Sequence, residues 1–403
     1  MDTTAQRAWS AEIKRELVEG ILPFWRELAD TDRGGFYGAV DCNGTVDREA
    51  PRSAVLTARI LWTFAAAARA FRGPRDREMA DHAFGYLAEQ FWDHKYEGVY
   101  WMLDANGRPL SDRKQVYAQA FALYALAEHH RATQDDDSLS LARRLYHLLE
   151  DHASDRVNGG YLEAAGRNWG ALDDMRLSEK DLNCPKSMNT NLHVMEAYTN
   201  LLRVWPDRDL KASQTALLNV TMDRIIDNDT GHFRLFFDKQ WNSLTGHISF
   251  GHDIEGSWLL VGAAEVLGQP EVLERARRLA IKIAYAVYEQ ARDRDGSLFY
   301  EADSSGNLVD PNKHWWAQAE AMVGFYNAYQ LSGDKDFFDA SHQLWRFISE
   351  RVIDRAHGEW HAKLKPTCEP FTAAEDGDAC LAGPWKCPYH NSRACLEMIA
   401  RLS

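Results

Sequence analysis

A glycine–aromatic signature recurs six times along the chain and constrains the fold more than any other feature. Each copy is a glycine followed by briefly alternating aromatic and polar residues, which is typical of a short strand or hairpin arm. The six copies are GGFYGAVD at Gly34, GVYWMLD at Gly98, GGYLEAA at Gly159, GHFRLFFD at Gly231, GSLFYEAD at Gly296 and GEWHAKL at Gly358. The near-constant spacing between these six glycines indicates a repeated supersecondary unit.

Each signature lies between two segments with helical periodicity, and the two segments differ in hydrophobicity. The preceding segment is amphipathic, as in REMADHAFGYLAEQFW, whereas the following one is apolar or small on nearly every side, as in AVLTARILWTFAAAARAF. A helix with one polar stripe lies at the surface, and a helix without one is buried. The sequence therefore predicts six units, each made of an outer helix, a hairpin and an inner helix.

Six such units predict an all-α fold, an (α/α)6 barrel with short β-hairpins between the outer and inner helices. An open solenoid would need polar capping repeats at its ends, but the first and last units resemble the middle ones. No linker or break in composition divides the 403 residues. We therefore expect residues 1–403 to form a single catalytic domain.

Composition and charge exclude several function classes. The formal net charge of −14 disfavours nucleic acid and anionic membrane surfaces as partners, because both attract basic proteins. No segment reaches the roughly 18 unbroken apolar residues of a membrane span, and the first residues lack the apolar core of a signal peptide. The six cysteines are scattered and contain no CxxC pair, so we expect a reduced, cytoplasmic enzyme.

The starts of the six inner helices should meet at one end of the barrel, because a hairpin leads into each of them. The polar and aromatic residues at these starts are Arg59, Tyr117, Asn189, His193, His252, Glu255, Trp315, Trp316 and His390. Each has an ordinary explanation when taken alone: a histidine in a buried helix is often a core residue, and Arg59 could pair with Glu255. Their coincidence at one structural position favours a cavity with acid/base groups.

The chain also contains five long motifs that resemble one family. They are FGHDIEGSWLL, MNTNLHVMEAYTNLLRVWPD, KQVYAQAFALYALAEHHRAT, RLSEKDLNCPKSMNT and GPWKCPYHNSRACLEM. Together they resemble the cellobiose 2-epimerases, which are grouped with N-acylglucosamine 2-epimerases and mannose isomerases, and the resemblance covers essentially the whole chain. It implies an isomerase that acts at C2 of a reducing-end glucose or mannose unit. It also implies a small sugar as the only partner, no cofactor or metal, and a monomer or weak dimer.

The same resemblance implies a role for each candidate residue. His252 and His390 would exchange protons at C2, His193 would open the sugar ring, and Glu255 would assist His193 and hold His252. Five further residues would bind the sugar through hydroxyl contacts or ring stacking: Arg59, Tyr117, Asn189, Trp315 and Trp385.

The chemistry explains why these residue types are needed. The ring must open before a base can remove the proton at C2, next to the carbonyl, and a cis-enediolate forms. Return of a proton to the opposite face inverts C2, so two acid/base groups are required, and imidazoles with a pKa of about 6.5 suit this task. A guanidinium near O1 and O2 would stabilise the enediolate charge.

Three alternatives remain open at this stage. Residues 363–383 depart from the family's pattern, carry two cysteines and precede Trp385, so the enzyme could prefer free mannose over a disaccharide. A glycoside hydrolase on the same barrel would need two carboxylates, and the helix starts offer only Glu255. A non-catalytic protein could use the aromatic cavity for binding alone.

Overall fold

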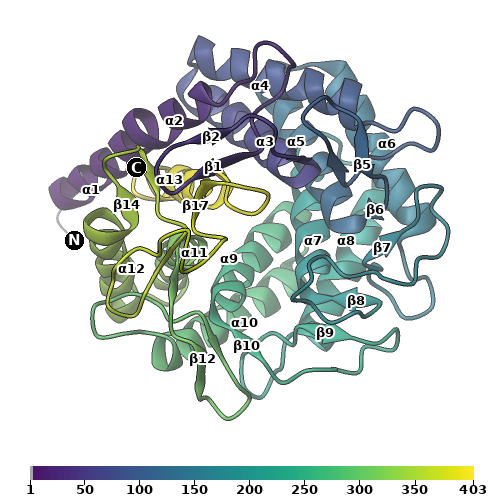
Figure 1. Ribbon diagram of the computed structural model, residues 1–403. Helices are drawn as coiled ribbons and strands as arrows, with labels where there is room; N and C mark the ends of the chain where they lie inside the picture. Colours follow the sequence, from purple (N-terminus) through teal and green to yellow (C-terminus); the bar gives the residue numbers. More distant parts are fainter. Residues whose placement is uncertain (1–2) are drawn as a thin grey trace.

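The computed structural model describes residues 3–403, which form a ring of paired helices (Figure 1). Neighbouring inner helices pack against each other around the whole ring, and the last packs against the first. The inner helices are α3 (Ala54–Phe71), α5 (Val116–Thr133), α7 (Met188–Leu202), α9 (Phe250–Leu267), α11 (Trp315–Ser332) and α13 (Tyr389–Arg401). The predicted (α/α)6 barrel is therefore confirmed.

The outer helices surround this ring and carry its polar surface. They are α1 (Thr3–Arg15) with α2 (Leu22–Glu27), then α4 (Pro74–Tyr86), α6 (Asp136–His152), α8 (Arg208–Val220), α10 (Pro270–Gln290) and α12 (Lys335–Phe347). The sequence did not predict four π-helical turns in these segments: η1 (Glu16–Ile21), η2 (Leu87–Phe91), η3 (Thr221–Ile225) and η4 (Ile348–Val352). Among the described helices, only α3 is apolar and long enough to cross a membrane, and it is mostly buried in the inner ring.

Short antiparallel strand pairs link each unit to the next. The strand before an inner helix pairs with the signature strand of the following unit: β3 (Arg52–Ser53) with β4 (Met102–Leu103), β6 (Lys114–Gln115) with β7 (Ala164–Ala165), β8 (Lys186–Ser187) with β9 (Phe236–Phe237), β10 (Ile248–Ser249) with β11 (Glu301–Ala302), and β13 (Lys313–His314) with β16 (Lys363–Leu364). The last strand of the series, β17 (Cys380–Ala382), pairs with β1 (Ala39–Asp41), with Val40 opposite Ala382. This pairing closes the ring, as an open solenoid could not.

Five more strands complete the hairpins and form one further pair. They are β2 (Val46–Asp47), β5 (Pro109–Ser111), β12 (Leu308–Asp310), and β14 (Ile353–Asp354) paired with β15 (Glu359–Trp360). The first glycine of every signature has a positive φ, between 71° and 88°. A side chain at that position would be strained, which explains why glycine recurs in the repeat.

One side chain near the start of an inner helix holds each of four signature hairpins. In α5, Gln119 accepts a hydrogen bond from the backbone N–H of Val99 (2.7 Å) and donates one to its carbonyl (2.8 Å). Asn191 and Gln318 form the same pair of bonds with Tyr161 and Leu298. In α9 the residue is Asp253, which accepts from the N–H of Phe233 and from Nδ1 of His232, both at 2.7 Å. These contacts position the helix starts relative to the hairpins.

A buried ion pair recurs at the same end of the units. A basic residue in the strand before the inner helix pairs with the aspartate that follows the outer helix: Arg52 with Asp30, Lys114 with Asp93, Lys186 with Asp155, and Lys313 with Asp293. A buried charge without its partner is costly, so each pair ties the end of one outer helix to the start of its inner helix.

Candidate active site

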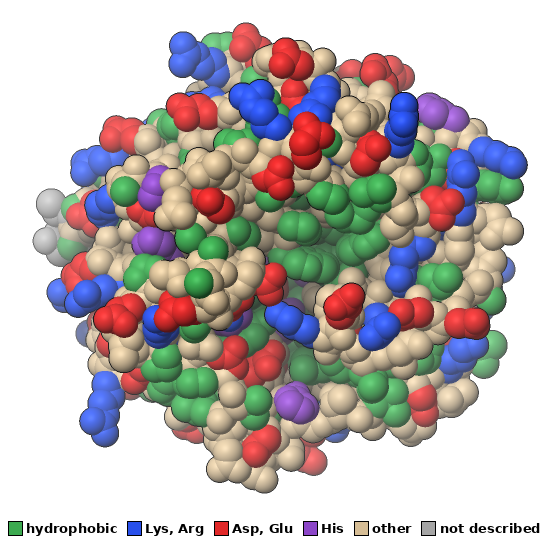
Figure 2. Space-filling view, in the orientation of Figure 1, with side chains coloured by type: hydrophobic (Ala, Val, Ile, Leu, Met, Phe, Trp, Pro, Cys, Tyr) green, Lys and Arg blue, Asp and Glu red, His purple; other side chains and the backbone are tan. Residues whose placement is uncertain are grey.

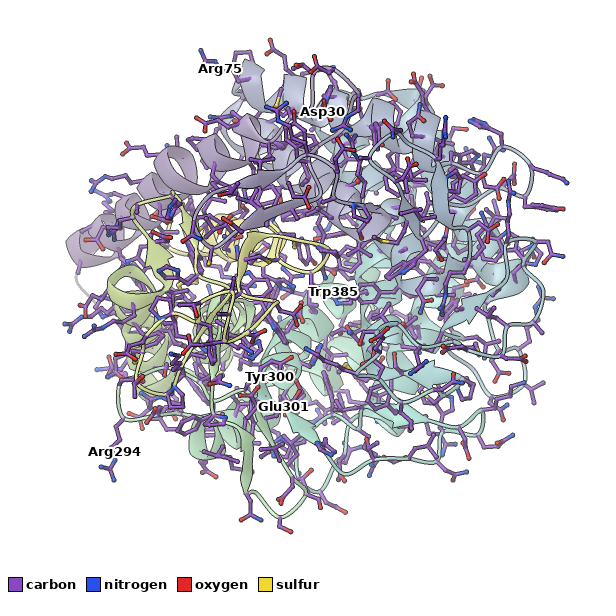
Figure 3. The ribbon with its side chains drawn as sticks, viewed as in Figure 1. Asp30, Arg75, Arg294, Tyr300, Glu301 and Trp385 are labelled. Atoms are coloured by element: carbon purple, nitrogen blue, oxygen red, sulfur yellow. The ribbon has the colours of Figure 1, made fainter. Side chains whose placement is uncertain are left out.

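The inner helices start on the face that carries the hairpins, and this face is hollowed. Figure 2 shows apolar side chains in the hollow and charged side chains around it. Trp385, Tyr300 and Glu301 lie near the middle of this face (Figure 3). The predicted site residues therefore belong to the open end of the barrel.

The three predicted histidines come together at this end. The rings of His252 and His390 both pack against Trp316, at centroid distances of 4.8 and 5.4 Å. The centroids of the two imidazole rings therefore lie no farther apart than the sum of these two distances. His193 packs edge-on against Tyr117 at 5.0 Å and against Phe121 at 4.7 Å, and Phe121 packs against Tyr389, the neighbour of His390.

Each histidine has a different hydrogen-bond partner at Nδ1. His252 meets the hydroxyl of Ser249 (2.7 Å), His193 meets Glu196 (2.9 Å) and His390 meets Glu320 (2.7 Å). No Nε2 atom of the three has a hydrogen-bond partner within residues 3–403. All three Nε2 atoms are therefore available to a bound molecule.

The expectation that Glu255 holds His252 is wrong. Ser249, the residue before α9, bonds His252, and Glu255 bonds Arg393 instead. The nearest histidine nitrogen to the Glu255 carboxylate is Nδ1 of His390, at 3.8 Å. The i, i+3 spacing placed both side chains on the inner face of the helix, but it did not determine which groups they contact.

Arg393 connects the carboxylates beneath the histidines, and sequence reasoning missed it. Its guanidinium contacts Glu196, Glu255 and Glu320, all of them buried. A signal was present in the sequence, because His193–Glu196 and His390–Arg393 have the same spacing as His252–Glu255. Glu320 also accepts a hydrogen bond from the indole N–H of Trp258 (3.1 Å).

Glu255, Glu320 and His390 have the spacing of a metal site, because their ligand atoms lie within 4.8 Å of one another. Arg393 already contacts both carboxylates of this group. The guanidinium therefore supplies the positive charge that the two carboxylates require, and the residues do not need a metal to balance them.

Burial shifts the pKa values of these groups in different directions. Burial lowers the pKa of His252 to about 4, with Glu255 opposing the shift, and burial together with Arg59 and Arg393 lowers the pKa of His390 well below its usual value. Burial raises the pKa of Glu320. For Glu196, Arg393 and His193 outweigh the effect of burial and lower the pKa to about 2. At neutral pH both acid/base candidates are neutral imidazoles, and Glu196 is ionised.

Arg59 is a buried cation that has no carboxylate partner among residues 3–403. Its side chain donates to the hydroxyl of Tyr117 (2.7 Å), lies 3.5 Å from the sulfur of Cys387, and faces the ring of Phe121 at 4.2 Å. The expected ion pair with Glu255 is not formed, because Glu255 pairs with Arg393. A buried charge that lacks an opposite charge is unfavourable, so a bound oxyanion would be a natural partner for Arg59.

The remaining predicted residues line the same end of the barrel. Trp385 is 37% exposed and lies 6.1 Å from the ring of Tyr117 and 6.2 Å from that of Trp101, so part of its indole is accessible to a ligand. Trp315 lies 6.3 Å from His390, farther than Trp316, which contacts both acid/base candidates. The indole N–H of Trp315 and the side-chain oxygen of Asn189 are buried without a partner among the described residues. Sugar hydroxyls would satisfy both.

Comparison with known proteins agrees with this arrangement. The family model for N-acylglucosamine 2-epimerase matches residues 35–381. A cellobiose 2-epimerase from Bacteroides fragilis is 43% identical over 96% of this chain and 98% of its own length. The solved structure of a cellobiose 2-epimerase from Bacillus thermoamylovorans has a TM-score of 0.93 and 39% identity, covering 98% of this chain and all of that one. A D-mannose isomerase from Marinomonas mediterranea is more distant, with 23% identity over 96% of each chain.

Proposed function

The chain belongs to the N-acylglucosamine 2-epimerase family, and from this membership we propose that it is a sugar 2-epimerase, an isomerase acting at C2 of a reducing-end glucose or mannose unit. The proposed substrate is a β-1,4-linked disaccharide such as cellobiose. The observation that carries the proposal is the pair of neutral imidazoles, His252 and His390, which both pack on Trp316 with Nε2 free. Such a pair suits proton removal on one face of a carbon and proton return on the other.

Ring opening is assigned to His193. Because Glu196 is ionised, it accepts the Nδ1 hydrogen of His193, and the Nε2 lone pair is left to accept a proton from the O1 hydroxyl. As the C1–O5 bond breaks and the C1=O1 carbonyl forms, the imidazolium returns this proton to O5. Asn189, one turn earlier on α7, offers a free oxygen that can bind a neighbouring hydroxyl. This step exposes the carbonyl that makes the C2 proton acidic.

Proton exchange at C2 is assigned to His252 and His390, which begin the reaction with their hydrogen on different ring nitrogens. His252 donates Nδ1–H to Ser249 and acts as the base through Nε2. We assign the proton shared by Glu320 and His390 to the carboxyl group, whose pKa burial raises, so the neutral ring of His390 carries its hydrogen on Nε2. When that hydrogen moves to C2, Nδ1 takes the proton from Glu320. The reverse reaction runs these transfers backwards.

Stabilisation of the negative charge of the enediolate is assigned to Arg59. A fixed donor at a developing oxyanion contributes about 3 kcal/mol in comparable enzymes. Arg59 is suited to this role because its guanidinium is held by Tyr117 and by aromatic rings, with no carboxylate to neutralise it. The hydrolase alternative is less favoured, since Arg393 engages both Glu255 and Glu320 and neither is free to act as a nucleophile.

The reaction is tested by incubating the protein with cellobiose in D2O and following the products by NMR. Epimerisation predicts glucosyl-mannose with deuterium at C2 and no free glucose. Release of glucose would indicate a hydrolase, and binding without deuterium uptake would indicate a non-catalytic protein. Turnover of mannose but not of cellobiose would indicate a monosaccharide 2-epimerase.

The preference for a disaccharide is proposed to depend on Trp385. An exposed indole face can stack on the second pyranose and bury its C–H surface. We expect Trp385→Ala to lower kcat/KM for cellobiose at least about tenfold, which corresponds to about 1.4 kcal/mol, while kcat/KM for mannose changes little. An equal loss for both sugars would place Trp385 in the catalytic centre instead.

Cellular location and assembly stay predictions. All six cysteines carry free thiols, which is expected in a reducing compartment such as the cytoplasm. We propose a cytoplasmic enzyme that is a monomer or weak dimer. Size-exclusion chromatography with light scattering measures its oligomeric state directly.

A further inference from the structure

Two long loops from distant parts of the sequence meet at the open end of the barrel. One loop, residues 166–185, precedes β8 and α7, and the other, residues 365–379, precedes β17 and Trp385. Nζ of Lys180 in the first loop lies 2.9 Å from Oδ2 of Asp378 in the second. Within residues 3–403 this is the only hydrogen bond or ion pair that joins the two loops.

The other polar contacts of each loop are made within the loop or with the preceding unit, as between Arg113 and the carbonyl of Asp174 (3.0 Å) and between Cys368 and Asp295 (3.2 Å). In the 365–379 loop, Lys365 pairs with Glu375 (2.5 Å), whose carboxylate also accepts from the backbone of Thr372. In the 166–185 loop, Asn183 donates to the carbonyl of Asp173 (2.9 Å). The pair between Lys180 and Asp378 is therefore the polar contact that can couple one loop to the other.

Lys180 lies close enough to Glu301, on the hollowed face (Figure 3), for its charge to act on that carboxyl group. Burial and Asp310 raise the pKa of Glu301, and the charge of Lys180 opposes that rise, so Lys180 acts on the rim that carries Glu301. The adjacent Tyr300 packs 5.8 Å from Trp316, which contacts both acid/base histidines. On the other side, Asp378 lies seven residues before Trp385.

The 166–185 loop also borders a cavity of its own. Its volume is about 490 Å3, and it is lined by Asp173, Asp174, Arg176, Asp181, Leu182 and Asn183. Asp181 is the residue next to Lys180. The ion pair thus joins the second loop to a loop whose carboxylate and amide groups border open space.

We propose that Lys180 and Asp378 form a latch that holds the two loops in place around the second sugar unit and so favours a disaccharide over a free monosaccharide. This inference rests on the proposed function. In the proposed function the reducing-end sugar binds among the inner-helix residues, whereas Lys180 and Asp378 are exposed at the rim, so the latch is expected to act mainly on the far sugar. Both side chains are largely exposed, at 84% and 74%, so the latch opens readily and salt weakens it.

The test compares Lys180→Gln, Asp378→Asn and the charge exchange Lys180→Asp/Asp378→Lys with the wild type. Exposed ion pairs alter equilibria by up to about fivefold. We expect each single variant to lower kcat/KM for cellobiose two- to fivefold, mainly through KM, with kcat/KM for mannose unchanged. The charge exchange should restore most of the loss. Salt at about 1 M should reduce the wild-type preference for cellobiose relative to about 0.01 M and leave Asp378→Asn unaffected.

Glu375→Gln is the matched control, because it neutralises a carboxylate in the same loop whose partner, Lys365, is also in that loop. It should leave the preference for cellobiose unchanged. Equal losses on both sugars, a loss in Glu375→Gln as large as in Asp378→Asn, or no loss in either single variant would overturn the latch.

Hydrogen exchange measures the coupling without turnover. Asp378→Asn should speed amide exchange in residues 173–184, on the opposite loop, whereas Glu375→Gln should not. If the wild type does not epimerise cellobiose, the proposed function fails, but this exchange result still decides whether the latch exists. Unchanged exchange in residues 173–184 would overturn the latch whatever the substrate.

Discussion

At the scale of single residues, the three histidines of the site differ in the group that each contacts through Nδ1. His252 bonds a hydroxyl, His193 the carboxylate of Glu196, whose pKa Arg393 lowers against the effect of burial, and His390 the carboxyl group of Glu320, whose pKa burial raises. An imidazole takes its tautomer from the group at its other nitrogen. Three histidines can therefore perform three different proton transfers in one cavity.

The first prediction concerns the two proton-exchanging histidines. We expect His252→Ala and His390→Ala each to lower kcat by at least about a hundredfold, as is usual for a general acid or base, while sugar binding measured by calorimetry survives. Trp316 remains in both variants, so the cavity wall is preserved. A variant that kept a tenth of the wild-type kcat would exclude that histidine as an obligatory acid/base group.

A second prediction follows from the low pKa of His252, about 4. A general base is active when deprotonated, so kcat/KM for cellobiose should stay nearly level from neutral pH to about pH 5 and fall as pH approaches the pKa. The measurement is kcat/KM against pH, with circular dichroism at each pH to confirm folding. A decline that begins near the ordinary histidine pKa of about 6.5 would contradict the assignment of His252 as the base.

At the scale of elements, the starts of the inner helices are held by buried polar contacts from the hairpins. Glu163, in the signature of the third unit, accepts hydrogen bonds from the backbone N–H of Ser187 (2.7 Å) and the hydroxyl of Thr190 (2.8 Å). Ser187 is also the N-cap of α7, the helix that carries His193. One buried carboxyl group thus holds the start of the helix that carries His193, the histidine proposed to open the ring.

Glu163 should make stability depend on pH, because burial raises its pKa from 4.5 to about 7. A carboxyl group with a raised pKa in the folded state stabilises the fold fully below about pH 4.5 and loses that contribution as pH rises through about 7. The shift corresponds to a few kcal/mol at most, at about 1.4 kcal/mol per unit. We expect the free energy of unfolding to decline between pH 5 and pH 8, and to decline less in Glu163→Gln.

Urea unfolding at pH 5, 6, 7 and 8 measures this slope. Glu27→Gln, at an exposed position on α2, serves as the control and should follow the wild type. An identical slope in Glu163→Gln and the wild type would show that Glu163 does not titrate in this range.

At the scale of the whole molecule, the ring depends on contacts between the first and last units. The β1–β17 pair, the bond from Trp25 to Glu359 and the bond from Trp360 to Glu16 (2.9 Å) each join residues more than 300 positions apart. These contacts close the barrel and position the 365–387 region next to the first inner helix, where Cys387 meets Arg59.

The β1–β17 pairing forms the seam between the first and last units. Disrupting this seam should destabilise the molecule even though it lies away from the acid/base groups. Val40 on β1 is buried, so Val40→Asp would bury an unpaired charge and lower the free energy of unfolding by about 3 kcal/mol. Val309→Asp, at a half-exposed position on β12, should change it by less than about 0.5 kcal/mol. Thermal unfolding of both variants makes the comparison, and equal effects would mean that the seam contributes little to stability.

The sequence by itself determined the six units, the inner and outer character of the helices and the positions at which functional side chains enter the cavity. These properties are local, because hydrophobic periodicity and a glycine with positive φ act within one unit of about sixty residues. They predicted the placement of His193, His252 and His390 at one end of the barrel, whereas Trp385 was expected there from the family resemblance. They also correctly separated the amphipathic outer helices from the apolar inner ones.

Only the tertiary structure decided which groups pair. Arg393 engages three carboxylates, Arg59 is left without one, and Lys180 reaches Asp378, in each case across many tens to nearly two hundred residues of sequence. Which side chains pair in this way depends on the distances between helices, and these are set by ring closure and packing. No local sequence pattern encodes those distances. For the same reason Glu255 appeared to belong to His252 from its spacing, while in the folded protein its carboxylate contacts Arg393.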